Sequence, residues 1–245
     1  MSRRLALVTG ASRGIGAATA RRLAACGIDV VIPYRSSEAA AAQVAAACRE
    51  LGAAAETIRT DVRDAASLAS LKERLDALGM SPDILVHSAG TAHYGLLADC
   101  REEDWDDLMN VHLKAAYRLT RLFSGAMAWR RWGRIVYLSS IWGVTGAAGE
   151  AAYAAAKGGL NAFAKSMAQE LASSGVTVNA VAPGAIDTEM LGNLSADERG
   201  ALERSVPLGR LGRPEEVADL IRYLVSEDAG YVTGQVIGLN GGWQA

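Results

Sequence analysis

The sequence is poor in cysteine and has no excess of basic residues. Its three cysteines, Cys26, Cys48 and Cys100, lie far apart and form no CxxC pair. That pattern argues against a disulfide framework or a zinc site and is typical of a reducing compartment. Lys and Arg number 25 against 27 Asp and Glu, so the charge balance does not favour nucleic acid as a partner.

Long apolar runs are also missing. The opening MSRRLALVTG resembles the start of a signal peptide, but its apolar run covers only Leu5 to Val8. No stretch approaches the roughly 18 apolar residues of a membrane helix. Half of the 245 residues are nevertheless hydrophobic and 21% are charged, a composition typical of a folded core. We expect a soluble cytoplasmic protein with no membrane partner and no resident metal.

Short apolar runs alternate with helical patterns along the whole chain. The predicted strands are 5–9, 29–34, 55–60, 83–88, 134–139, 176–182 and 235–240. The predicted helices are 14–26, 37–51, 64–79, 103–130, 150–174 and 214–226. Such alternation, with strands that are apolar throughout, predicts one α/β domain over 1–245, with about seven parallel strands and helices on both faces.

Residues 188–213 break this alternation. The segment is polar, carries Gly192, Pro207, Gly209 and Gly212, and offers only short helical patterns. An irregular insertion after a strand is typical of a mobile lid over a binding site. The alternative is a plain surface excursion.

A glycine-rich turn, TGASRGIG (9–16), follows the first strand and leads into a helix. This arrangement presents backbone N–H groups to a phosphate, although it matches neither GxGxxG nor a P-loop. Glycines also occur in turns for backbone reasons alone. The position at the first strand–helix junction favours a dinucleotide site.

The residues after the second strand indicate which dinucleotide. NAD-binding folds place an acidic residue here for the ribose 2′-hydroxyl, but the chain has Tyr34, Arg35, Ser36 and Ser37. Arg35 and Arg13 are suited to a 2′-phosphate, so the sequence predicts NADP(H). The alternative is two solvated arginines.

Small or polar residues follow four later strands as well, at Asp61, Ser88, Ser140 and Pro183. The carboxyl ends of parallel strands share one edge of a sheet, where ligands bind. In the helix after the fifth strand, Tyr153 and Lys157 stand four residues apart in YAAAK and so share a helix face.

Taken together, these motifs resemble the short-chain dehydrogenase/reductase family from Leu5 to Gly242. The motifs are TGASRGIG, DV (61–62), SAG (88–90), Ser140 thirteen residues before Tyr153, YAAAK and PGAIDT (183–188). The C-terminal part is especially similar to 3-oxoacyl-[acyl-carrier-protein] reductases. The resemblance implies a Rossmann-type doubly wound sheet and a ketoreductase.

The resemblance also implies residue roles. Tyr153 would donate a proton to the substrate carbonyl, Lys157 would lower the pKa of Tyr153 and hold the nicotinamide ribose, and Ser140 would bind the substrate oxygen. Thr188 would hold the carboxamide. The implied cofactor-binding residues are Gly10, Ser12, Arg13, Gly14, Ile15, Gly16, Arg35, Ser36, Asp61, Val62, Ser88, Ala89, Gly90, Tyr153, Lys157, Pro183, Gly184, Ile186 and Thr188.

The chain departs from the family pattern at two places. His87 and Ser88 stand where the family usually has two asparagines, and His112 stands at the position of the fourth catalytic residue, an Asn. His112 has three interpretations: its backbone carbonyl holds a water beside Lys157, its imidazole joins the proton relay, or it is simply a buried histidine.

The substrate pocket is expected near His93, Tyr94 and Trp142. Aromatic walls suit flat or conjugated groups, so we expect a 3-oxoacyl thioester with an unsaturated or aromatic tail, in fatty-acid, polyketide or pigment synthesis. The alternatives are an NADP-dependent alcohol dehydrogenase or reductase of a sugar, steroid or small ketone, and a non-catalytic cofactor sensor. Another possibility for the aromatic residues is packing alone.

Partners are expected from the resemblance as well. Arg131, supported by Arg130, matches a position at which related reductases contact acyl carrier protein, whereas a second common arginine is Ser174 here. The family also implies a homotetramer built through the long helices at 103–130 and 150–174.

Overall fold

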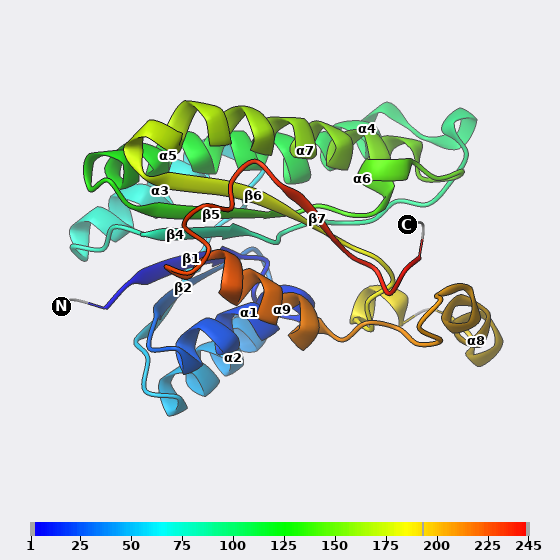
Figure 1. The fold of residues 1–245 in the computed structure, drawn as a ribbon, viewed down its shortest axis with the longest axis horizontal. Coiled ribbons are helices and arrows are strands. Elements are labelled where there is room, and N and C mark those ends of the chain that lie inside the picture. The colour runs from blue at the N-terminus through cyan, green and yellow to red at the C-terminus, as the bar shows by residue number, and fades with distance from the viewer. Residues whose placement is uncertain (1–2, 193, 244–245) are drawn as a thin grey trace.

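The computed structural model describes residues 3–192 and 194–243, which form one parallel sheet between two layers of helices (Figure 1). The strands are β1 (Leu5–Thr9), β2 (Asp29–Tyr34), β3 (Ala55–Arg59), β4 (Ile84–His87), β5 (Gly133–Leu138), β6 (Val176–Pro183) and β7 (Val236–Leu239). Their order is β3-β2-β1-β4-β5-β6-β7. The chain therefore builds outward from β1 in both directions, which confirms the doubly wound prediction.

Each face of the sheet carries its own core because side chains alternate along a strand. In β1, Ala6 and Val8 pack on one side, against α1 (Gly14–Ala25), α2 (Glu38–Glu50) and α9 (Pro214–Leu224). Leu5 and Leu7 pack on the other side, against α3 (Ala65–Ala77), α5 (Ala115–Trp129) and α7 (Ala151–Leu171). Figure 1 shows the two helical layers below and above the sheet.

The helix expected over 103–130 is interrupted. It consists of α4 (Glu102–Leu108), a π-helical turn at Met109–Lys114 and α5. The carbonyl of Val111 accepts a hydrogen bond from the His87 ring, so a side chain from β4 competes for a carbonyl that a regular helix would use internally. π turns of this kind are frequent at functional sites, and this one contains His112.

The segment expected to form a lid, residues 188–213, is called the lid segment below. Its described residues, 188–192 and 194–213, contain more regular structure than the sequence indicates. It contains a 3₁₀ turn at Glu189–Leu191 and helix α8 (Ala196–Ser205), whose start is capped by Ser195. Its base is fixed because Asp187 N donates to Gly212 O at 2.8 Å and Gly212 N donates to Ala185 O at 2.9 Å. The two ends of the lid segment are therefore joined by hydrogen bonds beside the end of β6.

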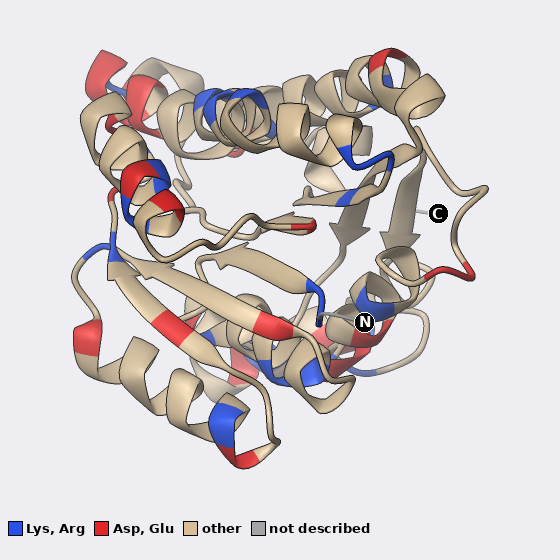
Figure 2. Ribbon diagram, turned by 90° about the vertical axis from the view of Figure 1, so that its left-hand side faces the viewer, with Lys and Arg blue, Asp and Glu red and all other residues tan. Residues whose placement is uncertain are grey.

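Charges of both signs are mixed over the outer helices, as Figure 2 shows, in keeping with the balanced composition. Within the described ranges, no helix is long and apolar enough to cross a bilayer.

Candidate active site

The C-terminal ends of the central strands meet at one edge, as the sequence predicts. After β1, Gly10 approaches the end of β4 so closely that a Cβ there would lie 2.6 Å from Ala89 N. After β5, Ile141 N donates to Pro183 O of β6 at 3.0 Å. These contacts bring motifs from four distant parts of the chain into one rim.

The turn after β1 has the features of a phosphate site. Gly10 and Gly14 adopt positive φ angles of 68° and 55°, a conformation that residues with a Cβ rarely adopt. Helix α1 begins at Gly14 with no side-chain cap and no acidic residue in its first turn. Its first N–H groups are therefore left for an anion, so these residues fit the pyrophosphate of a dinucleotide.

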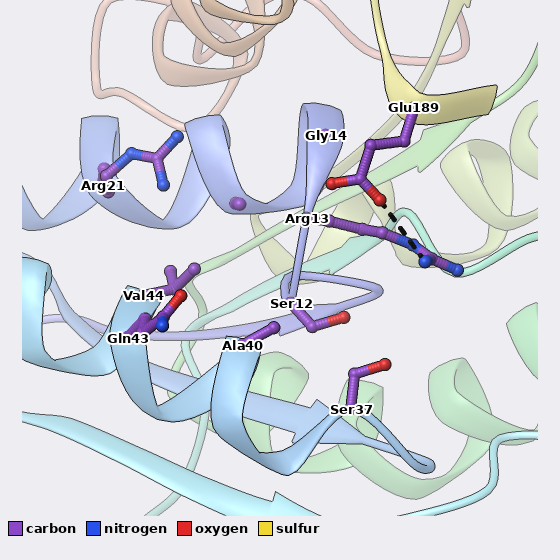
Figure 3. A pocket seen from close by; sticks show the side chains of 10 residues that line it. Ser12, Arg13, Gly14, Arg21, Ser37, Ala40, Gln43, Val44 and Glu189 are labelled. Atoms are coloured by element: carbon purple, nitrogen blue, oxygen red, sulfur yellow. Dashed lines mark hydrogen bonds and ion pairs between the residues drawn. The ribbon is translucent and has the colours of Figure 1, made fainter. Parts of the chain in front are cut away.

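A cavity of about 380 Å³ lies beside this turn, between α1 and α2 (Figure 3). It is lined by Ser12, Arg13, Gly14, Ala17, Arg21, Ser37, Ala40, Gln43, Val44 and Glu189. Arg13 Nη1 forms an ion pair with Glu189 of the lid segment at 3.4 Å. Arg35 and Ser36 are exposed and are not among the lining residues. Arg21, about two turns further along α1, is a second cavity arginine that the sequence analysis did not single out.

Asp61, one of the implied cofactor-binding residues, follows β3 and is bound by Arg63. The Arg63 guanidinium donates to its carboxylate from Nε at 3.0 Å and from Nη2 at 2.7 Å. This hydrogen bonding holds the pKa of Asp61 below its ordinary value. Arg63 also pairs with Asp107 at 2.6 Å. The Asp61 side chain is therefore held in place by Arg63.

Lys157 is buried on α7, and its ammonium points to the sheet. Nζ donates to the carbonyl oxygen of Leu138 at 2.6 Å and lies 5.4 Å from the centre of the Tyr153 ring. Burial lowers its pKa from the ordinary range to about 7. Near neutral pH, Lys157 therefore exists in both protonation states.

The pKa of Tyr153 differs from the expectation. Burial raises it to about 12; the Ser140 hydroxyl lowers it, and the Glu150 carboxylate raises it further. Lys157 was expected to lower this pKa, but its ammonium is directed at Leu138 and is itself destabilised by burial. In this state desolvation outweighs the attraction between ammonium and phenolate.

A close approach of two helices sets Ser140 beside Tyr153. Gly143, in the short helix α6 (Trp142–Thr145), lies so near α7 that a Cβ would be 2.7 Å from the carbonyl carbon of Lys157. Asn161 of α7 donates to Gly143 O at 2.9 Å and holds the contact. The sequence analysis missed Gly143, although a glycine three residues after the expected catalytic serine was the available signal.

His87 takes over a bridging role beside the site. Its Nδ1 accepts from the Thr9 hydroxyl at 2.8 Å and its Nε2 donates to Val111 O at 3.0 Å. Thr9 in turn accepts from Ala89 N at 3.2 Å. Burial, with Lys157 nearby, lowers the pKa of His87 to about 4, so the ring stays neutral. It links β1, β4 and the π turn.

His112 lies against the catalytic tyrosine. Its ring meets the Tyr153 ring edge to face, with centroids 5.3 Å apart. Because a carbonyl only accepts, the 2.8 Å contact to Thr91 O assigns the ring proton to Nε2. Nδ1 is then a bare acceptor, with no partner in the described part of the chain. Burial and the Lys157 charge lower the pKa of His112 well below its ordinary value.

The predicted pocket residues separate into two groups. Tyr94 is 81% exposed and packs across Gly149, while the loop is held by the bond from Gly95 N to Gly149 O at 2.9 Å. His93 lies close enough to Glu150 to affect its pKa. Trp142, in contrast, is half-buried and contacts Trp243, which the sequence analysis missed.

Arg130 and Arg131 do not lie at the entrance of this chain's own site. They precede the first residue of β5, whereas Ser140 follows its last, and six strand residues span roughly 20 Å. Arg130 bonds to Ser81 Oγ at 2.7 Å and Arg131 to Ser173 O at 3.1 Å. Within one chain, these arginines therefore lie at the opposite end of β5 from Ser140.

Comparison with known proteins gives a consistent picture. A family model described as enoyl-(acyl carrier protein) reductase matches residues 10–244. The chain is 43% identical to the 3-oxoacyl-[acyl-carrier-protein] reductase of Escherichia coli over 239 residues, 98% of this chain and 96% of that protein. It is 40% identical to an uncharacterized oxidoreductase of Bacillus subtilis, over 97% of this chain and 98% of that one.

Among solved structures, one described provisionally as a gluconate dehydrogenase from Agrobacterium tumefaciens superimposes with a TM-score of 0.95. Its sequence is 32% identical, and the match covers 99% of this chain and 96% of that one. The doubly wound sheet, the Ser140–Tyr153–Lys157 cluster and these likenesses agree: the chain belongs to the short-chain dehydrogenase/reductase family of oxidoreductases.

Proposed function

We propose that the protein reduces a 3-oxoacyl thioester to the 3-hydroxyacyl thioester with NADPH, in fatty-acid, polyketide or pigment synthesis in the cytoplasm. The observation that carries the proposal is the 43% identity to 3-oxoacyl-[acyl-carrier-protein] reductase over 98% of the chain. The cluster of Ser140, Tyr153 and Lys157 supports it, because a carbonyl needs a proton donor and an oxygen-binding group.

NADP(H) would supply the hydride. The uncapped start of α1 would hold the pyrophosphate, and the cavity with Arg13 and Arg21 offers guanidinium groups for the 2′-phosphate. The ion pair between Arg13 and Glu189 competes with that phosphate. Thr188 lies beside the turn, 3.6 Å from where a Gly14 Cβ would be, which suits contact with the nicotinamide end.

The chain's own groups divide the carbonyl chemistry. The Ser140 hydroxyl would bind the ketone oxygen as charge develops on it, while the Tyr153 hydroxyl gives up its proton. A phenol with a pKa near 12 is a weak acid, so protonated Lys157 is needed to stabilise the phenolate left behind. His112, neutral and with a bare Nδ1 acceptor, fits a water-holding role beside the tyrosine.

Delivery of the thioester on an acyl carrier protein is part of the proposal. Since Arg130 and Arg131 lie at the other end of β5, they would serve a carrier only at the site of another copy of the chain. A homotetramer formed through α5 and α7, as the family resemblance implies, is therefore tied to this use of the arginines.

A second candidate function is the NADP-dependent oxidation of a sugar acid or small alcohol. It is favoured by the likeness to the structure described as a gluconate dehydrogenase. It would use the same Ser140, Tyr153 and Lys157. A non-catalytic cofactor sensor is the third alternative, and the complete catalytic cluster argues against it.

Turnover of a panel of substrates separates these functions. Purified protein with NADPH is offered acetoacetyl-N-acetylcysteamine, crotonyl-N-acetylcysteamine and, in the oxidising direction with NADP⁺, gluconate. We expect turnover of the first only, and at least about a thousandfold loss of kcat in Tyr153→Phe, which removes the proton donor. Turnover of gluconate alone favours the second function. Absence of all turnover, with NADPH still bound, favours the sensor.

A further inference from the structure

Two tryptophans from segments far apart in the sequence contact each other near the catalytic serine. Trp142 opens α6, just after β5, and Trp243 follows β7, about a hundred residues later in the chain. Their rings pack edge to face, with centroids 5.1 Å apart and planes at 69°. This is a favoured aromatic geometry, in which each ring restricts the other.

The first tryptophan of the pair lies two residues after the catalytic serine. The backbone N–H of Trp142 donates to Ser140 Oγ at 3.2 Å, so the backbone that carries this indole lies beside the catalytic hydroxyl. Both indoles are half-buried, so part of each remains open to a ligand. The two rings thus form one wall beside Ser140, which we call the tryptophan wall.

The turn that carries Trp243 is fixed by its own hydrogen bonds and by the lid segment. Trp243 N donates to Asn240 O at 3.0 Å, and Leu208 N of the lid segment donates to Gly241 O at 3.1 Å. Gly241 adopts a φ of 63°, and a Cβ there would lie 2.8 Å from Val206 Cγ1. The position of Trp243 therefore depends on the lid segment, and a movement of the lid segment would shift this tryptophan.

We propose that Trp243 is a specificity-determining residue, which with Trp142 selects 3-oxoacyl thioesters carrying a planar group next to the ketone. A planar ring stacks on indole with an aromatic contact that a saturated ring of the same size lacks. A puckered ring meets the face of an indole with fewer atoms than a planar ring does. This inference rests on the proposed function, because it concerns the acyl group of the same substrate.

A matched pair of substrates isolates this effect. The N-acetylcysteamine thioesters of 3-oxo-3-phenylpropanoate and 3-cyclohexyl-3-oxopropanoate have the same reacting groups and ring size but differ in planarity. We expect the NADPH-dependent kcat/KM of the unaltered protein to favour the phenyl compound by about three- to tenfold, the scale of one aromatic contact. In Trp243→Ala the ratio falls to about one, whereas Trp243→Phe keeps part of it.

Trp129→Ala is the control, because Trp129 is 86% exposed at the end of α5, away from the wall; its ratio should equal that of the unaltered protein. The inference is overturned if Trp243→Ala and Trp243→Phe both keep the full preference, or if the unaltered protein shows none. If the unaltered protein reduces neither thioester, the proposed function fails and the inference falls with it, a result distinct from an unchanged ratio.

Discussion

At the scale of single residues, Lys157 combines a functional position with an energetic cost. Its ammonium is buried and, within the described part of the chain, has one hydrogen-bond acceptor, the Leu138 carbonyl at 2.6 Å. A buried amine without a carboxylate partner favours its neutral form, and the pKa of about 7 reflects this. The residue is retained at the expense of stability, as is common at catalytic positions.

Replacing Lys157 with Met should therefore stabilise the cofactor-free protein while abolishing turnover. Below about pH 7 the folded lysine is charged and its desolvation cost is fully present. As the pH rises above 7 towards the unfolded value near 10.4, the folded lysine is neutral while the unfolded one is still protonated, so the disadvantage shrinks. We expect Lys157→Met to raise Tm by at least about 3 °C at pH 6, corresponding to roughly 1 kcal/mol, and by less at pH 9.

Thermal unfolding of both proteins across this pH range makes the measurement. Lys165→Met, at an exposed position of the same helix, controls for the loss of a lysine and should show no such trend. A Tm for Lys157→Met below that of the unaltered protein at pH 6 would contradict the burial argument.

The protonation state of His112 is set by its environment more than by its residue type. Free imidazole titrates near neutrality, but burial and the Lys157 charge lower the pKa of His112 well below that range. The structure thus favours a neutral ring over one that is protonated during turnover.

The pH–rate profile of His112→Asn tests this. We expect kcat to fall by less than about tenfold, the scale of one neutral hydrogen bond, with the limbs of the profile between pH 6 and 9 in place. A limb that moves by a full pH unit in the variant would instead assign the titration to the imidazole.

At the scale of elements, the contact between α6 and α7 is the part of the site that leaves least room for a larger side chain. Gly143 lets the backbone that follows Ser140 rest on Lys157, and Asn161 closes the contact. A side chain here would push the serine away from the tyrosine. The short helix α6 is therefore a spacer that sets the distance between two catalytic groups.

Gly143→Ala should lower kcat/KM by about a hundredfold, because the added Cβ, 2.7 Å from Lys157 backbone, displaces Ser140 by a fraction of an ångström or more. The same change should cost about 1–3 kcal/mol of stability, as other overpacked contacts do. Steady-state kinetics and denaturant unfolding measure the two effects.

Gly125→Ala is the matched control for that variant. Gly125 lies within α5, is exposed, and has open space around its Cβ position. It should keep full activity and gain stability, since alanine is favoured in a helix. Equal activity of the two variants would show that the α6–α7 contact does not position Ser140.

The elements differ in how far the sequence predicts them. Most of the strands were predictable because they are short apolar runs closed by a turn. The π turn was not, because it depends on the bond from His87 to Val111, two residues that meet only when β4 packs on that helix. Nor could spacing show that the Tyr153–Lys157 pair would be governed by burial, since helix periodicity gives the shared face and not the solvent around it.

At the scale of the whole molecule, the sheet separates the two ends of every strand. This explains why Arg130 and Arg131 lie far from the catalytic serine of their own chain: they precede β5, whereas Ser140 follows it. The order of motifs along the chain contained this information once β5 was recognised as a parallel strand. The fold class and the rim followed from the same reasoning, and the catalytic roles from the family resemblance. Trp243 was not found, because the end of β7 gave no sign of turning back to α6.

The assembly proposal makes a prediction for Arg131. Its φ of 54° is unusual for a residue with a Cβ, so Arg131→Gly removes the side chain without straining the turn. If a carrier bound to one copy uses this arginine on another, KM for acetoacetyl-carrier protein should rise about two- to fivefold, the scale of one exposed charge, with no change for acetoacetyl-N-acetylcysteamine.

Light scattering of the same samples should give about four times 25.6 kDa. A monomeric mass, together with an unchanged KM, would remove both the tetramer and the carrier contact.

The formal net charge of −2 counts every lysine as fully charged, and Lys157 departs from that count. With its pKa at about 7, the molecule carries a fractional charge there at neutral pH. A ligand whose hydroxyl oxygens accept from Nζ favours the ammonium, so binding draws a proton from the solvent. Ligand affinity then varies with pH without any change in the contacts themselves, and the heat of binding includes the ionisation heat of the buffer.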